Sequence, residues 1–401
     1  MSTTYKKIFN THLKKFPCIL IAGPKFYGRQ DAITDLLPND HIKFSLGSPE
    51  VRAKAIRYPQ EIFDTKAKVI LLEDIQYAPS LAKHIRDHIN KNQSMNQKFV
   101  LTSSFAIQEL KEITKNLSSK FSILHIKPGY LIDANNSTSK GIVSFPDKKS
   151  KPISKSDILK SFLYGYSRVN KNKHTKSSQA WYDTWLTTYI EREVRAIRNI
   201  ENITDFQIFL KRIASQNDTT LNMAEIAREL NVSLNTIKAW MTILANSFVV
   251  NLIKPYRLNY GIRCKRTPHL YFNDTGLISY LTGIKKVSDL EKSEHLISML
   301  KSVAINEIYR WYFNRGDFPI FSMWSPSNQE DSCILLESGD KIYAFDFSIR
   351  AKTNIKEFKF HQQLMNIFGN SIILHNIHLE DDYHKIADNC FSSPIQWMLK
   401  W

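Results

Sequence analysis

Three short apolar segments constrain the fold of this chain more than any other feature. They are residues 16–22, 67–72 and 98–104, and each ends in glycine or polar residues. Helical patterns, such as that of residues 78–91, lie between them. Short apolar segments that alternate with helices are typical of a buried parallel sheet. The sequence therefore predicts an α/β domain over residues 1–133, with its ligand at the carboxyl ends of the strands.

The loop after the first apolar segment, IAGPKFYGRQD, has the outline of a phosphate-binding loop. Such a loop normally ends in Gly-Lys-Ser/Thr, where the lysine reaches the β- and γ-phosphates and the hydroxyl holds Mg²⁺. Here Arg29 is a bulkier cation, and Gln30 is a poor Mg²⁺ ligand. The sequence leaves open whether the loop binds ATP with Mg²⁺ or keeps only its shape. The candidate ligand-binding residues are Gly23, Pro24, Lys25, Gly28, Arg29 and Gln30.

Two carboxylates, Glu73 and Asp74, follow the second apolar segment. A nucleotide site needs one carboxylate at this place to hold Mg²⁺ and often a second to polarise water. Their position after a predicted strand, together with the glycine loop, makes both candidate catalytic residues. The alternative is a pair of acids that faces solvent.

The charge of the chain favours an anionic partner. There are 55 Lys+Arg against 38 Asp+Glu, which leaves a net charge of +17. Such an excess favours contact with nucleic acid or an anionic surface, although a solvated lysine-rich surface also explains it. The four cysteines lie far apart, which predicts neither a disulfide framework nor a metal centre. Since no apolar run reaches the length of a membrane span, we expect a soluble cytoplasmic protein without a membrane partner.

Residues 221–247 have the pattern of a helix-turn-helix, LNMAEIAREL and LNTIKAWMTILANS joined by NVS. Residues 254–269 then carry five Lys/Arg and no acid, which predicts a winged helix with a basic wing. In DNA binders the second helix enters the major groove and the wing touches phosphates. Alternatively, the winged helix packs against the ATPase-like domain or a protein partner. The candidate nucleic-acid contacts are Asn235, Lys238 and Thr242 on the helix, with Arg257, Arg263, Lys265 and Arg266 on the wing.

The remaining composition completes the predicted organisation. Residues 134–215 begin as a Ser/Lys/Pro-rich basic linker and become helical. The winged helix then occupies residues 216–285. Helix and strand patterns over residues 286–401 predict a small C-terminal α/β domain.

Several segments, taken in order, resemble a family of prokaryotic AAA-type ATPases of the AAA+ superfamily. They are GPKFYGRQDAIT, VILLEDIQ, FVLTSS, YIEREV and PHLYFNDTGL, and the resemblance covers nearly the whole chain. It implies an N-terminal P-loop domain, a winged helix and a C-terminal domain resembling restriction endonucleases. The chain departs from the family at the nucleotide site. The family's Gly-Lys-Thr is Gly28-Arg29-Gln30, its Asp-Glu is Glu73-Asp74, and Lys120 stands where the family has a possible arginine finger.

The resemblance also places two nuclease-like motifs on Glu330-Asp331-Ser332 and Asp346-Phe347-Ser348. Such a nuclease needs a carboxylate pair for a divalent metal and a lysine two residues after the second acid. Serines replace one metal aspartate and the lysine, so Glu330, Asp331 and Asp346 are expected to form a degenerate site.

Together these features favour an ATP-binding protein with weak nucleotide binding and slow or absent hydrolysis. Whether it acts as an enzyme stays open at this point. The alternatives are a non-enzymatic DNA-binding scaffold and, less favoured, a divergent metal-dependent nuclease.

Overall fold

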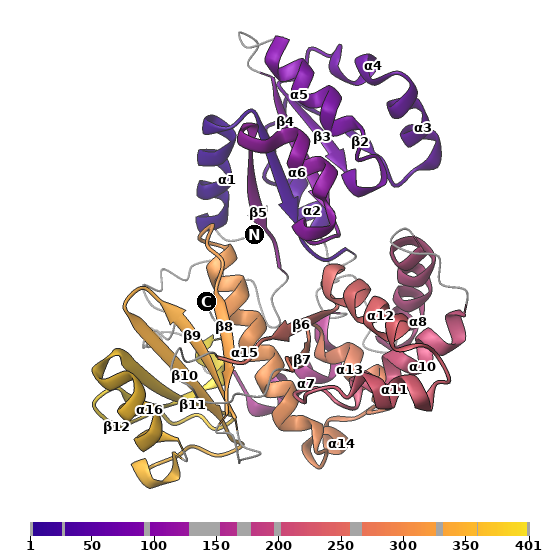
Figure 1. Ribbon diagram of the computed structural model, residues 1–401. Helices are drawn as coiled ribbons and strands as arrows, with labels where there is room; N and C mark the ends of the chain where they lie inside the picture. Colours follow the sequence, from indigo (N-terminus) through magenta and orange to yellow (C-terminus); the bar gives the residue numbers. More distant parts are fainter. Residues whose placement is uncertain are drawn as a thin grey trace.

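The computed structural model describes residues 3–25, 29–91, 97–127, 153–166, 178–195, 202–256, 267–325, 332–358 and 360–398. Figure 1 shows an N-terminal α/β part at the top, a mostly helical part at the lower right and a C-terminal sheet at the lower left. The long helix α15 (His295–Phe313) lies between the helical part and the C-terminal sheet.

The N-terminal part is built on a five-stranded parallel sheet. Its strands are β1 (Cys18–Ala22), β2 (His41–Ser45), β3 (Val69–Glu73), β4 (Lys98–Ser103) and β5 (Phe121–His125). The order is β2-β3-β4-β1-β5, and every pairing is parallel. The three predicted strands are confirmed as β1, β3 and β4. The two edge strands, β2 and β5, were not predicted because they are only partly buried and contain polar residues.

Both faces of this sheet are covered, which explains the continuous apolar runs. Successive side chains of a strand point to opposite faces, so Cys18 and Leu20 join one core while Ile19 and Ile21 join another. The covering helices are α1 (Thr3–Lys15), α2 (Arg29–Thr34), α3 (Pro49–Arg57), α4 (Pro59–Phe63), α5 (Leu81–Lys91) and α6 (Lys111–Leu117). Three short 3₁₀ turns, η1 (Ile75–Tyr77), η2 (Ile107–Glu109) and η3 (Ser118–Lys120), complete the layer.

The middle of the chain is helical. Its elements are α7 (Lys155–Tyr164), α8 (Ser178–Tyr189), the π-helix η5 (Ile190–Val194), α10 (Ile203–Ala214), α11 (Met223–Glu229), α12 (Leu234–Asn246), α13 (Thr275–Thr282) and α14 (Val287–Glu291). The predicted helix pair at residues 221–247 is α11 and α12. Ser233 begins α12 as predicted, because its Oγ accepts a hydrogen bond from the Thr236 amide at 3.0 Å. The antiparallel pair β6 (Val250–Ile253) and β7 (His269–Phe272) follows.

The C-terminal part contains a six-stranded mixed sheet of order β12-β13-β11-β10-β9-β8. Its elements besides α15 are β8 (Ile320–Trp324), β9 (Cys333–Ser338), β10 (Lys341–Phe347), η6 (Ile355–Glu357), α16 (His361–Phe368), η7 (Gly369–Ser371), β11 (Ile372–His378), β12 (His384–Ala387), β13 (Cys390–Pro394) and α17 (Ile395–Met398). The predicted helix and strands at α15, β9, β10 and β11 are confirmed. The short elements β8, β12, β13 and α17 were not predicted.

A single hydrophobic core joins the helical part to the C-terminal sheet. It includes Leu277 on α13, Met299 and Val303 on α15, and Phe345 on β10. This core runs across residue 285, where the sequence pattern changes. Burial of apolar surface across that position couples the two parts more strongly than a mobile linker would.

No helix among the described residues is long and apolar enough to cross a membrane.

Candidate functional site

The glycine loop lies where the strand order predicts a ligand. Because β3, β4 and β1 are neighbours and parallel, their carboxyl ends meet at one edge of the sheet. Gly23 follows β1 and donates its amide to the Ser103 carbonyl at 3.1 Å. A Cβ at Gly23 would lie 2.3 Å from the Ile126 carbonyl oxygen, so only glycine fits this close approach. Gly28 lies outside the described residues.

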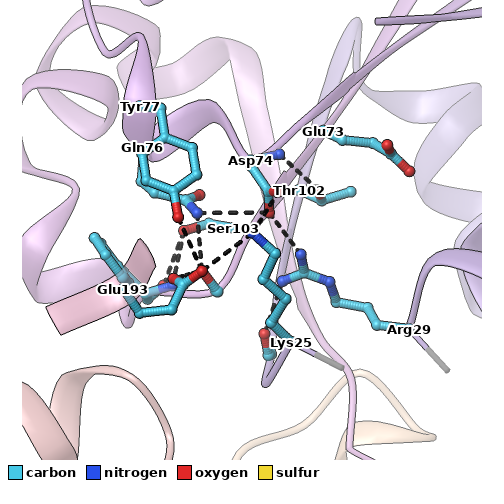
Figure 2. Close-up of polar contacts among 12 residues, drawn as sticks. Lys25, Arg29, Glu73, Asp74, Gln76, Tyr77, Thr102, Ser103 and Glu193 are labelled. Atoms are coloured by element: carbon cyan, nitrogen blue, oxygen red, sulfur yellow. Dashed lines mark hydrogen bonds and ion pairs between the residues drawn. The ribbon is translucent and has the colours of Figure 1, made fainter. Parts of the chain in front are cut away.

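Arg29 begins α2 and is almost fully buried. Its guanidinium donates to the Gly23 carbonyl at 2.9 Å and to Asp74 Oδ1 at 2.7 Å. Figure 2 shows the side chain reaching from α2 toward Asp74. The residue at the usual lysine position is therefore bound by the loop backbone and by an internal carboxylate. The neighbouring Gln30 is exposed.

Lys25 binds the other oxygen of the same carboxylate. Its Nζ lies 2.9 Å from Asp74 Oδ2 and 3.1 Å from Glu193 Oε1. Burial by itself raises the pKa of Asp74, but the charges of Arg29 and Lys25 outweigh it and hold that pKa below its usual value. Asp74 is consequently ionised at neutral pH and bridges the two cations of the loop.

The backbone at Asp74 directs this side chain into the site. Its φ is +59°, in the left-handed region that Asp and Asn adopt more readily than most residues. The Asp74 amide donates to Thr102 Oγ1 at 3.1 Å, which ties the turn to the end of β4.

Glu73 points away from this group in Figure 2. Its Oε1 lies 3.8 Å from Lys43 Nζ on β2. Burial raises the pKa of the Glu73 carboxyl, and Lys43 partly offsets this. Of the two predicted catalytic carboxylates, only Asp74 therefore lies beside the glycine loop.

Glu193 is the site residue that sequence reasoning missed. It lies in η5, yet only 1% of it is exposed, because its carboxylate enters the edge of the sheet that carries the glycine loop. Oε1 accepts from Lys25 at 3.1 Å and from the Tyr77 hydroxyl at 2.9 Å, and Oε2 accepts from Ser104 Oγ at 2.5 Å. Burial and the Glu193 charge raise the pKa of Tyr77, so this phenol stays protonated and donates. The signal in the sequence was an acid on the apolar face of an amphipathic helix.

The space beside these residues is small. Pro24, Lys25 and Ser104 line it on one side, and it closes against the helical part through Trp185, Tyr189, Glu193, Ser247, Phe248 and Val249. Its cavity volume of about 10 Å³ is roughly that of one water molecule. Lys120 lies elsewhere, in η3 before β5, at the amino edge of the sheet. Within one chain it is therefore not brought to the loop.

The predicted nucleic-acid residues of α12 share one exposed face. Asn235, Lys238 and Thr242 are all exposed, at the spacing that places them on one side of a helix. The other end of α12 contacts the N-terminal part, since the Ala106 amide donates to the Asn246 carbonyl at 2.6 Å. The predicted wing residues Arg257, Arg263, Lys265 and Arg266 lie outside the described residues.

The nuclease-like residues are only partly described. Asp346 lies in β10 and forms an ion pair with Lys352, six residues later in the chain. In the resemblance, the lysine position of the nuclease motif falls on Ser348 instead. Ser348 Oγ instead donates to the Arg350 carbonyl at 2.5 Å. Glu330 and Asp331 fall outside the described residues. In the part of the chain that is described, no group of three or more His, Cys, Asp or Glu side chains is arranged to hold a metal.

The segment PHLYFNDTGL has a structural explanation. Asp274 is the N-cap of α13 and accepts from the Gly276 amide at 3.0 Å and from the Tyr182 hydroxyl at 2.8 Å. A Cβ at Gly276 would lie 2.1 Å from the Tyr182 hydroxyl oxygen, which requires glycine. Burial raises the pKa of Asp274 to about 6, and the hydrogen bonds partly oppose this.

Comparisons with known proteins give limited matches. A family model described as "Domain of unknown function (DUF8612)" matches residues 162–288, the span that contains Glu193 and α12. The uncharacterized proteins Mb2031c of Mycobacterium bovis and Rv2008c of Mycobacterium tuberculosis are each 26% identical over 136 residues. That stretch covers 34% of this chain and 31% of each relative, so the match spans about a third of those proteins.

Among solved structures, the chain is similar to the Walker-type ATPase Paby2304 of Pyrococcus abyssi. The TM-score is 0.41 at 11% identity, over 70% of this chain and 95% of that one. A TM-score below 0.5 leaves the fold to be judged from the strand order and register given above.

Proposed function

We propose that the N-terminal part is an AAA-type nucleotide-binding domain with an altered phosphate loop. In this proposal it binds ATP weakly and hydrolyses it slowly or not at all. The observation that carries the proposal is the double ion pair from Arg29 and Lys25 to Asp74. A glycine loop at the carboxyl edge of a parallel sheet supports a phosphate site. The cations that would bind phosphate, however, already have an internal anion.

Magnesium binding faces the same competition. Mg²⁺ takes carboxylate oxygens in near-octahedral geometry, and hydrolysis of ATP depends on it. Arg29 forms an ion pair with Oδ1 of Asp74, and Lys25 forms one with Oδ2. Gln30, at the usual hydroxyl position, supplies no replacement hydroxyl. Mg²⁺ would have to displace a bound cation, so we expect catalysis to suffer more than binding.

Nucleotide affinity should be low for the same reason. Phosphate oxygens must replace Asp74 as the partners of Lys25 and Arg29, so only the difference between the two sets of contacts contributes to binding. We expect a dissociation constant for ATP of about 0.1–1 mM, which corresponds to only about 4–5.5 kcal/mol of binding free energy.

Calorimetric titration with ATP tests this proposal, with Arg29→Ala as the decisive variant. Removing Arg29 deletes a phosphate cation and leaves Asp74 less neutralised, so binding should fall below detection. Arg57→Ala is the matched control, since Arg57 is exposed on α3. Equal ATP affinity in Arg29→Ala and in the wild type would show that nucleotide does not use this loop. No binding by the wild type would reject the proposal.

A second candidate function is contact with nucleic acid through α12. Asn235, Lys238 and Thr242 are exposed on one face of this helix, and the chain carries a net charge of +17. Helix-turn-helix proteins present the second helix to the major groove in this way. A winged helix formed by α11, α12, β6 and β7 would use this face for bases and its basic wing for phosphates.

A mobility-shift titration with duplex DNA tests the second candidate. Lys238→Glu should weaken binding at low salt, and the triple charge reversal at Arg263, Lys265 and Arg266 should weaken it further and flatten its salt dependence. Lys111→Glu on α6 is the matched control, because it makes the same change of charge at another exposed helix position. No shift at low salt, or an equal loss in the control, would reject this candidate.

A further inference from the structure

Glu193 lies where the phosphate loop meets the helical part of the molecule. We propose that its carboxylate is an internal competitor for the polyphosphate ligand, which must displace Glu193 from Lys25 and thereby open the joint between the two parts. This inference rests on the proposed nucleotide site and adds how that site is regulated.

The donors around Glu193 suit a phosphate group. Lys25 comes from the glycine loop, Tyr77 from η1 and Ser104 from the end of β4, and all three donate to the one carboxylate. Converging donors at the carboxyl edge of a parallel sheet are the usual surroundings of a bound phosphate. Glu193 therefore satisfies the donors that a phosphate oxygen would otherwise recruit.

The two glutamates of η5 have different surroundings, and Glu193 is the one that contacts Lys25. Glu191, two residues earlier, is exposed and pairs with Arg195 at 3.0 Å. Glu193 is almost fully buried, and a buried carboxylate persists only when it is paired and hydrogen-bonded. Its burial thus depends on Lys25, and Lys25 is in turn occupied by Glu193 as well as Asp74.

The available space makes displacement necessary. The cavity that Lys25 and Glu193 help to line has a volume of about 10 Å³, which leaves room for about one water molecule and not for a phosphate chain. A ligand can reach Lys25 along this side only if η5 moves away. The same joint contains the Tyr189–Ser247 hydrogen bond of 2.7 Å and the Ala106–Asn246 hydrogen bond of 2.6 Å.

Opening this joint would change the contacts at the carboxyl end of α12. Asn246 and Ser247 mark the carboxyl end of α12, whose exposed face carries the proposed nucleic-acid residues. A polyphosphate that displaces Glu193 would therefore change how α12 is held against the N-terminal part. By linkage, any partner that moves α12 away would raise the affinity of the loop for polyphosphate by the same factor.

The test compares the affinity of the full chain for ATP and for inorganic tripolyphosphate. Glu193→Gln keeps the shape of the side chain but removes the competing charge, so we expect binding of both ligands to tighten about tenfold, the usual scale of one charge-assisted contact. Glu191→Gln is the matched control and should leave the affinity unchanged. Hydrogen exchange of the peptide amides at residues 185–195 should rise on ligand binding in the wild type, and without ligand in Glu193→Gln.

The outcomes separate this inference from the proposed function. If the wild type binds and Glu193→Gln binds equally or more weakly, the inference is overturned and the nucleotide site stands. If only Glu193→Gln binds, the inference is supported and the proposed binding by the wild type is rejected. If neither binds, both are rejected.

A second variant guards against loss of folding. Tyr189→Phe removes the hydrogen bond to Ser247 that helps hold the joint closed and leaves the donors around Glu193 in place. If a thermal melt shows that Glu193→Gln is unfolded, Tyr189→Phe decides the matter. Tighter tripolyphosphate binding by about two- to fivefold supports the inference, and unchanged or weaker binding overturns it.

Discussion

The glycine-loop edge of the parallel sheet and the exposed face of α12 use their polar residues in opposite ways. At the loop, Arg29 is buried and Lys25 is largely buried. Asp74 binds both cations, and Glu193 also binds Lys25. On α12, Lys238 is exposed beside Asn235 and Thr242. Removing one partner of a buried ion pair destabilises the fold strongly, because the other charge is left buried and unpaired. Removing one partner of an exposed ion pair changes stability little. A net charge of +17 therefore does not locate a ligand site, because some cations are bound within the chain.

The largest expected effect is at Asp74. Asp74→Ala removes the carboxylate that pairs with both the largely buried Lys25 and the buried Arg29. We expect a loss of about 3–5 kcal/mol in the free energy of unfolding, measured by urea denaturation. Glu61→Ala is the matched control, since Glu61 forms an exposed ion pair with Lys54, and it should change stability by less than about 1 kcal/mol. A loss at Asp74 as small as that of the control would show that the buried ion pairs do not stabilise the loop.

A pH effect is expected at Lys127, another internal cation. Burial lowers the pKa of Lys127 to about 7, although the buried Glu307 raises it in part. Its Nζ donates to Asn273 Oδ1 at 2.8 Å and lies 4.6 Å from the centre of the Tyr309 ring. Between pH 7 and 10.5 the unfolded chain keeps this proton and the native chain releases it, so stability should rise with pH in that window.

The slope should be at most about 1.4 kcal/mol per pH unit for this one proton. Lys127→Met should flatten the rise, and Lys115→Met, at an exposed position of α6, should not. Denaturation midpoints between pH 7 and 9 measure this. An equal slope in the wild type and Lys127→Met would contradict the assignment.

A smaller effect is expected at the start of α12. Ser233→Ala removes the side-chain oxygen that accepts from the Thr236 amide, which should cost about 1 kcal/mol of stability. Ser233 lies before the exposed face of α12, so its loss should weaken DNA binding only by unfolding the first turn of this helix. Thr242→Ala is the comparison, since Thr242 Oγ1 donates to the Lys238 carbonyl of the same helix at 2.8 Å. A greater loss of stability in Thr242→Ala than in Ser233→Ala would contradict the capping role.

The smallest effect on stability is expected at Lys238. Lys238→Ala should change the free energy of unfolding by less than about 0.5 kcal/mol, because the side chain is exposed. It should nevertheless weaken DNA binding at low salt, because the proposal places the Lys238 ammonium group in the major groove. Chemical denaturation and titrations of DNA binding at low salt give the two numbers. A large loss of stability at this position would remove the contrast with Asp74.

Sequence patterns predicted the elements that are strongly periodic or fully buried. The apolar strands β1, β3 and β4 and the pair α11–α12 were found because burial and caps leave direct signals. The edge strands β2 and β5 were missed because partly exposed strands mix polar and apolar residues. The site was only partly predictable for a different reason. Which carboxylate meets Lys25 depends on a contact between residues 168 positions apart.

The burial of Glu193 is indicated by the hydrophobic periodicity around it. Glu193 falls three residues after Ile190 and four after Tyr189, on the buried side of the helix. An acid at such a position requires a buried partner, although the pattern does not say which one. The left-handed turn at Asp74 makes the side chains of Glu73 and Asp74 point in different directions. Hydrophobic periodicity does not predict such a turn.

The most direct test of the internally neutralised loop is ATP turnover by the wild-type protein with excess Mg²⁺ at the highest attainable ATP concentration. We expect a rate on the order of 10⁻³ s⁻¹ or lower, because both oxygens of Asp74 already carry cations. A rate of about 1 s⁻¹ or higher that Asp74→Asn abolishes would contradict this, since Asp74 would then be free to hold Mg²⁺ during catalysis.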